Sequence, residues 1–162
     1  MAAIRRKLYV ETTIVSYLTA RSSRDLIRAA RQEITREWWE SRRSDFDCYV
    51  SQVVVDEAGK GDAQAAERRL GLLAGMPRLE LTEMVSVLAA ALLDQHALPR
   101  NAVEDALHIA LASVHGMDFL LTWNCSHIAN AEIMGAIHET IRSFGYASPV
   151  ICTPEELLGD WT

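Results

Sequence analysis

The sequence lacks several features that define large classes of proteins. It has no run of eighteen apolar residues, so no segment is long enough to cross a bilayer as a helix. Its N-terminus carries basic residues, but the short apolar run that follows ends at a glutamate, which is not the pattern of a secretory signal peptide. We therefore expect a cytoplasmic protein with no membrane segment.

Cysteine and histidine are scarce and are poorly spaced for disulfide or zinc chemistry. The three cysteines, Cys48, Cys125 and Cys152, are far apart and include no CxxC pair, so neither a disulfide framework nor a structural zinc site is indicated. No two of the five histidines are four residues apart, which excludes a zinc helix of the HExxH type. We expect three reduced thiols and no zinc.

The chain also lacks repeats, low-complexity tracts and segments with the composition of a linker. Its 162 residues, of which 49% are hydrophobic and 23% charged, are enough to bury one core without disulfides or metals. We expect a single domain that covers residues 1–162.

Charge is distributed unevenly along this chain, whose net charge is −6. Residues 1–43 contain ten arginines and lysines against five acidic residues, whereas the remainder contains six against seventeen. Arg24, Arg28 and Arg31 follow the i, i+4, i+7 spacing of one helix face and could contact the phosphates of a polyanion. The alternative is a solvated face whose arginines pair partly with acidic neighbours, namely Asp25, Glu33 and Glu37.

Apolar periodicity predicts strands that alternate with helices. β-Favouring or fully apolar runs predict strands at 7–11, 48–51, 78–82, 119–124 and 150–153. Helix-forming segments predict helices at 24–43, 52–58, 62–74, 83–97, 99–115 and 131–144, with a last helical turn at 154–158. Parallel strands need helical crossovers, so this order predicts an α/β fold with three layers, in which helices flank a central parallel sheet of about five strands.

Polar residues indicate where several helices begin. Ser51 and Thr82 are placed to cap the helices that follow them. Pro99 suits the first turn of the next helix, with Asn101 as an alternative cap. The residues directly after the first strand predict a turn, although Thr12 and Thr13 could both act as helix caps.

The segment VEDALHIALA, residues 103–112, carries two adjacent carboxylates in an otherwise apolar helix. Consecutive helical residues point about 100° apart, so Glu104 and Asp105 cannot face the same way. We expect Glu104 at the surface and Asp105 partly buried, where a carboxylate needs an ion pair, hydrogen bonds or a bound cation. A structural pairing of Asp105 with Arg100 or His108 is one explanation.

Other oxygen-bearing side chains follow the ends of other predicted strands. Glu11 closes the first strand, Glu57 lies on the helix after the second, and Asn124 ends the strand that follows the Asp105 helix. Ligands bind at the carboxyl ends of parallel strands, so these four side chains could meet at one edge of the sheet. Three carboxylates and an amide suit a hard ion such as Mg²⁺ or Mn²⁺, and without a cation the carboxylates would raise one another's pKa values.

Four segments, in this order, resemble the successive motifs of PIN-domain proteins, especially the VapC-type ribonuclease toxins of bacterial toxin–antitoxin pairs. The segments are LYVETTIVSYL, VSQVVVDEAGKGD, EDALHIALASVHGMDFLLTWN and VICTPEELL, and the resemblance covers residues 7–158. It implies a PIN-like three-layer α/β/α fold and a metal-dependent endoribonuclease that cleaves RNA phosphodiester bonds. It also implies a homodimer and a small antitoxin protein that neutralises the enzyme.

The resemblance places the family's catalytic and metal-binding group on Glu11, Glu57, Asp105 and Asn124, with Mg²⁺ or Mn²⁺ as the cofactor. Two positions depart from the family pattern. The first acid is usually aspartate, and the longer Glu11 requires either a metal farther from the strand end or a side chain that folds back. Asn124 stands where an acid is frequent and offers an oxygen without a charge. The three remaining carboxylates favour one tightly held metal over two.

Five further residues are predicted to contact the substrate. They are Thr12, Arg24, Arg28, His127 and Asn130. For His127 and Asn130, which follow Asn124 in the chain, capping of the next helix is the alternative to orienting a phosphate.

Two other functions remain open. The long Glu11, the uncharged Asn124 and the acidic net charge also suit a catalytically weak or inactive PIN module that binds RNA or a protein partner. A phosphoryl-transfer protein of the receiver or phosphatase type needs an aspartate nucleophile after the first strand. Here Glu11 stands at that position, and no lysine follows the later strands.

Overall fold

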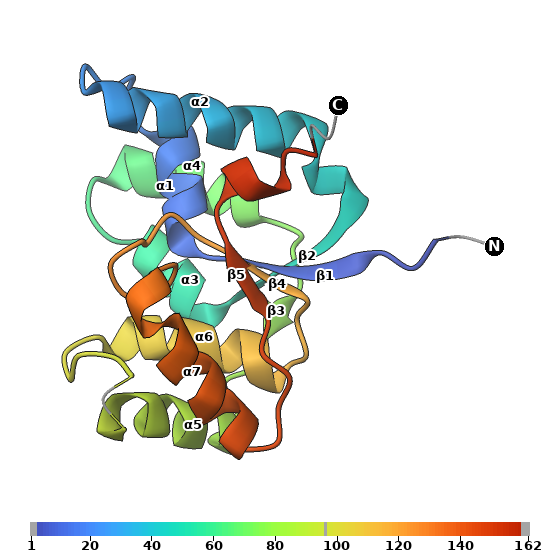
Figure 1. Ribbon diagram of the computed structural model, residues 1–162. Coiled ribbons are helices and arrows are strands. Elements are labelled where there is room, and N and C mark those ends of the chain that lie inside the picture. The colour runs from blue at the N-terminus through green and yellow to red at the C-terminus, as the bar shows by residue number, and fades with distance from the viewer. Residues whose placement is uncertain (1–2, 96, 160–162) are drawn as a thin grey trace.

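The computed structural model describes residues 3–95 and 97–159 and has a five-stranded sheet at its centre (Figure 1). The strands are β1 (Arg6–Val10), β2 (Phe46–Ser51), β3 (Arg78–Leu79), β4 (Phe119–Leu121) and β5 (Val150–Cys152). Their order across the sheet is β3-β2-β1-β4-β5. Each neighbouring pair is parallel, which confirms the predicted parallel sheet.

Helices cover both faces of the sheet and complete the predicted α/β/α layers. In Figure 1, α1 (Thr12–Thr19), α2 (Leu26–Ser41) and α4 (Ala63–Leu73) lie above the sheet, and α5 (Glu83–Asp94), α6 (Val103–Val114) and α7 (Ala131–Ser143) lie below it. Helix α3 (Gln52–Ala58) follows β2, and the 3-10 turns are η1 (Arg43–Asp45) and η2 (Pro154–Leu157). Among the described residues, no helix combines the length and apolar character needed to cross a membrane.

The direction in which the chain adds strands reverses beside β1. The chain first adds β2 and β3 on one side of β1, and then returns to add β4 and β5 on the other side. The ends of β1 and β4 are joined where the Glu11 N–H donates to the Leu121 carbonyl at 3.1 Å. Ligands of open parallel sheets bind outside the carboxyl ends of the strands at such a reversal. The residues that follow β1 and β4 are therefore placed to form a site.

Local cap chemistry predicted several helix starts correctly. Ser51 and Thr82 each accept a hydrogen bond from the backbone N–H three residues further on, as N-caps of α3 and α5. Asn130 caps α7 by accepting the Glu132 N–H at 2.9 Å, which confirms the capping interpretation of this residue.

The prediction of a turn after the first strand is wrong, because helix α1 begins there. Thr12 is the first residue of the helix, and the N-cap is Glu11 rather than a threonine. The β-branched residues of α1 have low intrinsic helix propensity. Ile14 and Val15 are fully buried in the core, and this tertiary packing outweighs the local preference.

Helix α6 begins later than the sequence predicts. Pro99 and Asn101 lie in a turn closed by a hydrogen bond from the Ala102 N–H to the Pro99 carbonyl at 2.9 Å. The helix starts at Val103, and its N-cap, Ala102, offers no side-chain bond. Asp105 consequently lies in the first turn of α6, where the helix dipole favours a carboxylate.

Helix α2 also begins later than predicted, with Asp25 as its N-cap. Arg24 precedes the helix, so the prediction that it shares a helix face with Arg28 and Arg31 is wrong. Of the acidic neighbours considered as partners, only Glu33 forms an ion pair within the described chain, and that pair is with Arg36 at 2.6 Å.

The three cysteines are free thiols, as predicted, but their environments differ. Cys125 is exposed, whereas burial raises the pKa of Cys48 to about 11 and that of Cys152 to about 12. At pH 8 roughly one Cys48 side chain in a thousand is then the reactive thiolate. We predict that iodoacetamide alkylates Cys125 alone in the folded protein, giving one adduct by mass spectrometry and three after unfolding. Alkylation of folded Cys152 as fast as Cys125 would contradict its buried position.

Candidate active site

The predicted catalytic and metal-binding residues lie at the carboxyl edge of the sheet on four different segments. Glu11 joins β1 to α1, and Glu57 lies on α3 after β2. Asp105 is in the first turn of α6, and Asn124 lies in the loop after β4. The fold therefore gathers side chains that are far apart in the sequence at the reversal in strand order.

The side chain of Glu11 folds back over the start of α1. Its Oε2 accepts hydrogen bonds from the Thr13 N–H at 3.0 Å, from the Thr13 hydroxyl, and from the Thr122 hydroxyl at 2.8 Å. This is one of the two arrangements that the longer side chain allowed. Glu11 is only 3% exposed. Burial raises the pKa of its carboxyl, although the charge of His108 and these hydrogen bonds oppose the rise.

Glu57 is paired with a buried histidine. Its Oε1 lies 2.6 Å from Nε2 of His108 and accepts the Thr12 hydroxyl at 2.7 Å. Burial alone would raise the pKa of Glu57, but the hydrogen bond and charge of His108 lower it to about 2. The expectation that the gathered carboxylates raise one another's pKa values is therefore wrong for Glu57, because His108 provides a positive charge beside it.

His108 is the common neighbour of the acidic side chains. Its ring is completely buried, and Nδ1 lies 2.7 Å from the Tyr9 hydroxyl. Burial alone would lower the pKa of His108, but the hydrogen bond to Glu57 and the charges of Glu11, Glu57 and Asp105 raise it. Carboxylates from three separate segments therefore act on one buried imidazole, which is protonated in the folded protein over a wider pH range than a free histidine.

Asp105 is held by the loop that follows β4. The Asn124 side-chain amide donates to Oδ1 at 3.0 Å, and Nδ1 of His127 lies 2.9 Å from Oδ2. The direct partners of Asp105 are therefore Asn124 and His127, and not Arg100 or His108. The side chain of Arg100 forms no ion pair with any described residue.

The carboxylate oxygens of Glu11, Glu57 and Asp105 are suitable ligands for a hard divalent ion, although they do not form a complete coordination site in this structure. Oε1 of Glu11 accepts no hydrogen bond from the described residues, so it could bind a cation without losing a protein contact. The Glu57 carboxyl is held through Oε1 by Thr12 and His108, and it also contacts the Glu104 side chain. The oxygen of Asn124 instead accepts two backbone N–H groups of its own loop. In the part of the chain that the structure describes, no three acidic, histidine or cysteine side chains are close enough to share a metal. Carboxylate oxygens fit Mg²⁺ or Mn²⁺, provided that Asp105 releases His127.

Three of the five predicted substrate contacts are engaged within the protein. Thr12 donates to Glu57, His127 contacts Asp105, and Asn130 caps α7. Arg24 and Arg28 are exposed at the start of α2, and neither forms an ion pair with a described residue.

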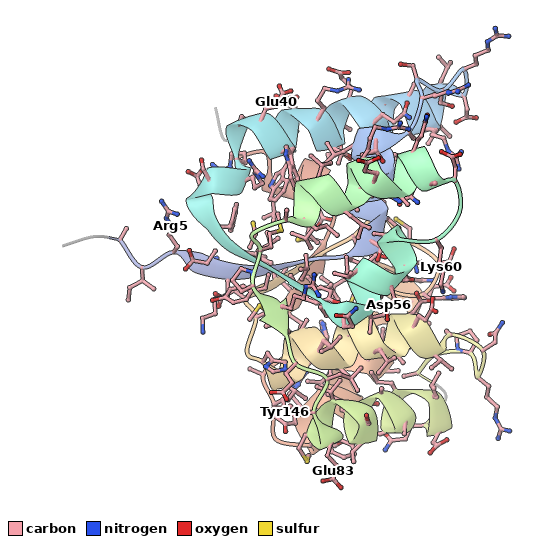
Figure 2. All side chains as sticks on the ribbon, turned by 180° about the vertical axis from the view of Figure 1, so that it is seen from behind. Arg5, Glu40, Asp56, Lys60, Glu83 and Tyr146 are labelled. Carbon is pink, nitrogen blue, oxygen red and sulfur yellow. The ribbon has the colours of Figure 1, made fainter. Side chains whose placement is uncertain are left out.

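Glu104 lies at the surface, as predicted. Its side chain is 52% exposed, and Oε1 lies 3.4 Å from Nζ of Lys60. Figure 2 shows Lys60 and Asp56 on the side of the molecule opposite to Arg5, where α3 ends. The Glu104 side chain also contacts Glu57, and that contact is one of the causes that lower the pKa of Glu57.

The sequence did not reveal that Thr13 and Thr122 donate to Glu11. It offered His108 as a possible partner of Asp105, whereas the structure pairs it with Glu57. A histidine within an apolar helix is itself a signal, because a buried imidazole needs a partner. The partner was not visible, since Glu57 lies 51 residues away in the chain. Thr122 carried no comparable signal.

Comparison with known proteins gives one family match. A search of curated proteins finds no match. The model of the PIN domain matches residues 8–124, a segment that contains Glu11, Glu57, Asp105 and Asn124. PIN domains are generally nucleases, and these generally use divalent metal ions. Because the match spans most of the chain, this protein belongs to the PIN domain family.

Proposed function

We propose that this protein is a metal-dependent endoribonuclease that cleaves RNA phosphodiester bonds, and that it acts in the cytoplasm as a VapC-like toxin neutralised by a small antitoxin. The observation that carries the nuclease proposal is the acidic group of Glu11, Glu57 and Asp105 around His108. It lies at the strand reversal of a PIN-family fold, where a ligand is expected.

The residues of the site divide into those that would hold the metal and those that position them. Glu11, Glu57 and Asp105 would bind Mg²⁺ or Mn²⁺, and Asn124 orients Asp105 through its amide N–H. Thr12 and His108 hold Glu57. A bound divalent ion supplies positive charge for the phosphate and lowers the pKa of a bound water.

The charge of the site favours one metal ion over two. Glu57 contacts the buried imidazole of His108, and the charges of Glu11 and Asp105 act on the same imidazole from farther away and help to raise its pKa. The remaining negative charge is close to that of one divalent cation, so a second ion would add uncompensated positive charge at short range.

Metal removal tests the nuclease proposal. With Mn²⁺, the purified protein is expected to cleave an end-labelled structured RNA into discrete fragments, because the carboxylates then present a cation to the phosphate. Excess EDTA should abolish cleavage, and added Mn²⁺ should restore it. Gel electrophoresis measures the fragments. Cleavage that persists in EDTA, or no cleavage with either Mn²⁺ or Mg²⁺, would reject the proposal.

A catalytically inactive PIN module that binds RNA or a protein partner is the second candidate. One observation favours it: both oxygens of Asp105 and the oxygen of Asn124 are already engaged by protein donors. The same assay separates the candidates, because an inactive module would retard the labelled RNA in a native gel without cleaving it.

The toxin proposal needs its own test. The protein is expected to co-purify with the product of an adjacent reading frame, and that product should inhibit RNA cleavage. Light scattering on the isolated protein tests the proposed homodimer. Absence of an adjacent small reading frame would count against the toxin role and would leave the nuclease proposal intact.

A further inference from the structure

Helices α1 and α2 line an open pocket near the candidate active site, which is called here the α1–α2 pocket. It has a volume of about 160 Å³ and is lined by Ser16, Tyr17, Ala20, Arg28 and Gln32. At about 30 Å³ for each water molecule, it has room for about five waters. At this size the open pocket can receive one flat heterocycle.

The α1–α2 pocket is close to the acidic group. The Ser16 hydroxyl donates to the Thr12 carbonyl at 3.1 Å, and the Thr12 hydroxyl donates to Glu57. One turn of helix is about 5.4 Å long. A nucleic acid with a phosphate at the acidic group therefore has a neighbouring base within reach of the pocket.

The aromatic wall of the pocket is held rigid from behind. The ring of Tyr17 lies 5.9 Å from that of Trp123, whose indole N–H donates to Thr35 at 2.7 Å. The guanidinium of Arg31 lies 5.1 Å from the centre of the Trp123 ring. A hydrogen bond with Tyr17 raises the pKa of Arg31. The surface is thus preorganised, which lowers the entropic cost of binding a flat ligand.

On the α2 side of the pocket, the Gln32 amide is held by hydrogen bonds, and the Arg28 guanidinium is exposed. Gln32 donates to the Arg21 carbonyl at 2.8 Å and accepts the Ser23 N–H at 3.0 Å, which fixes the loop between α1 and α2. Arg28 is exposed, and its side chain forms no ion pair with any residue that the structure describes. Arg28 can therefore contact an anion at the mouth of the pocket.

A larger hollow continues from the pocket across α1. It has a volume of about 790 Å³, shares Ser16 and Ala20 with the pocket, and is also lined by Arg21 and Arg68. The acid that lines it, Asp62, caps α4 by accepting the Ala65 N–H. Arg28 therefore lies on one side of Ser16 and Ala20, and Arg21 and Arg68 lie on the other. This local positive charge contrasts with the net charge of −6 for the whole chain. A phosphate backbone could follow this path.

We propose that the α1–α2 pocket receives one unpaired base of a single-stranded RNA segment, with Tyr17 against the base and Arg28 against the adjoining phosphate. The choice of RNA rests on the proposed nuclease function. RNA-binding proteins take unstacked bases on aromatic side chains and arginine planes, which is the pair of side chains found here. A pocket for an apolar side chain of a protein partner would not need Arg28 at the pocket, or Arg21 and Arg68 in the adjoining hollow.

Binding without cleavage tests this proposal. In EDTA, fluorescence anisotropy measures the affinity for a short single-stranded RNA and for copies that carry one abasic nucleotide at each position in turn. Loss of the base at the pocket should weaken binding by wild type by about 5- to 150-fold, the range for one base stacked on an aromatic ring. Tyr17→Leu should weaken binding of the intact strand by a similar factor and remove the difference between intact and abasic strands.

Two further variants keep the test independent of folding. Ala20 is exposed, so Ala20→Leu fills the pocket without removing a contact and should reproduce the loss seen with Tyr17→Leu. Arg36→Gln is the matched control, because Arg36 is an exposed residue of α2 that pairs with Glu33 outside the pocket. It should bind the intact strand and discriminate against the abasic one as wild type does.

The outcomes separate this proposal from the nuclease proposal. If wild type binds intact and abasic strands equally at every position, or if Tyr17→Leu and Ala20→Leu both leave RNA binding unchanged, the base pocket is rejected. Base-dependent binding without Mn²⁺-dependent cleavage would retain the pocket and remove the nuclease function. If wild type cleaves RNA with Mn²⁺, but Tyr17→Leu distinguishes intact from abasic strands as well as wild type does, the nuclease function is retained and the base pocket is rejected.

Discussion

Replacing Asp105 by asparagine is expected to lower the rate of RNA cleavage by about 100-fold or more. The substitution keeps the size of the side chain and removes one of the three charges that would hold the metal. Loss of a single group that stabilises developing charge typically costs 100- to 1,000-fold in rate, or about 2.7–4 kcal/mol. Single-turnover cleavage of the labelled RNA with saturating Mn²⁺ measures the effect.

Glu83→Gln is the matched control for Asp105→Asn. Glu83 also lies in the first turn of its helix, α5, loses the same charge on substitution, and is exposed. Its cleavage rate should stay within about 3-fold of wild type, because an exposed charge away from the site has little energetic effect. Equal rates for Asp105→Asn and wild type would remove Asp105 from the proposed machinery.

Replacing His108 by leucine is expected to lower the free energy of unfolding by about 3 kcal/mol. Breaking a buried charge pair by removing one partner costs about 3–5 kcal/mol. The lower end applies because Glu57 is 21% exposed and keeps its bond from Thr12. The Tyr9 hydroxyl also loses a partner. Since domains are stable by only about 5–15 kcal/mol, urea unfolding will detect this change easily.

His127→Leu provides the comparison for His108→Leu. His127 also contacts a carboxylate of the site, Asp105, but its side chain is 36% exposed. Its removal should cost less than about 1 kcal/mol, because its imidazole is itself partly solvated, unlike that of His108. A double-mutant cycle of His108→Leu with Glu57→Gln should show strong coupling. Equal destabilisation by the two histidine substitutions would contradict the central, buried position of His108.

The pH dependence of stability follows from the same pair. The folded-state pKa of His108 is raised, so its stabilisation is complete below its ordinary pKa of 6.5 and is lost as the pH rises through the folded-state pKa. The groups that act on it are Tyr9, Glu11, Glu57 and Asp105. Wild type should therefore lose stability relative to His108→Leu as the pH is raised above 6.5. Urea unfolding at several pH values measures that difference.

Local chemistry predicted the order of the elements and much of their detail. An apolar run marks a strand covered on both faces, and β1 and β4 are such strands, with Leu8 and Leu120 fully buried. The caps Ser51 and Thr82 depend only on a side-chain oxygen near the start of a helix. Such features can be recognised without knowing what lies nearby in space.

Features that depend on tertiary packing were not predictable in the same way. Helix α1 forms from β-branched residues because its buried face packs on the core and Glu11 caps it. Helix α6 starts at Val103 without a side-chain cap, so no local signal marked its beginning. Both errors arise where packing outweighs local preference.

The sequence predicted which residues near the strand ends form the candidate site. It did not predict the hydrogen bonds and ion pairs between their side chains. Parallel topology alone brings Glu11, Glu57, Asp105 and Asn124 to one edge of the sheet. Which donor meets which carboxylate depends on side-chain packing between distant segments. The pairing of His108 with Glu57, and of His127 with Asp105, is therefore visible only in the folded chain.

The most direct test of the acidic group is calorimetric titration of the metal-free protein with Mn²⁺, for wild type and for Asp105→Asn. Carboxylates that converge from three segments should bind one ion per chain with a dissociation constant in the millimolar range or lower. Asp105→Asn should weaken that binding at least about 10-fold, and Glu83→Gln, at an exposed position on α5, should leave it unchanged. No Mn²⁺ uptake by wild type at millimolar concentration, or equal uptake by Asp105→Asn, would contradict a metal site at this edge of the sheet.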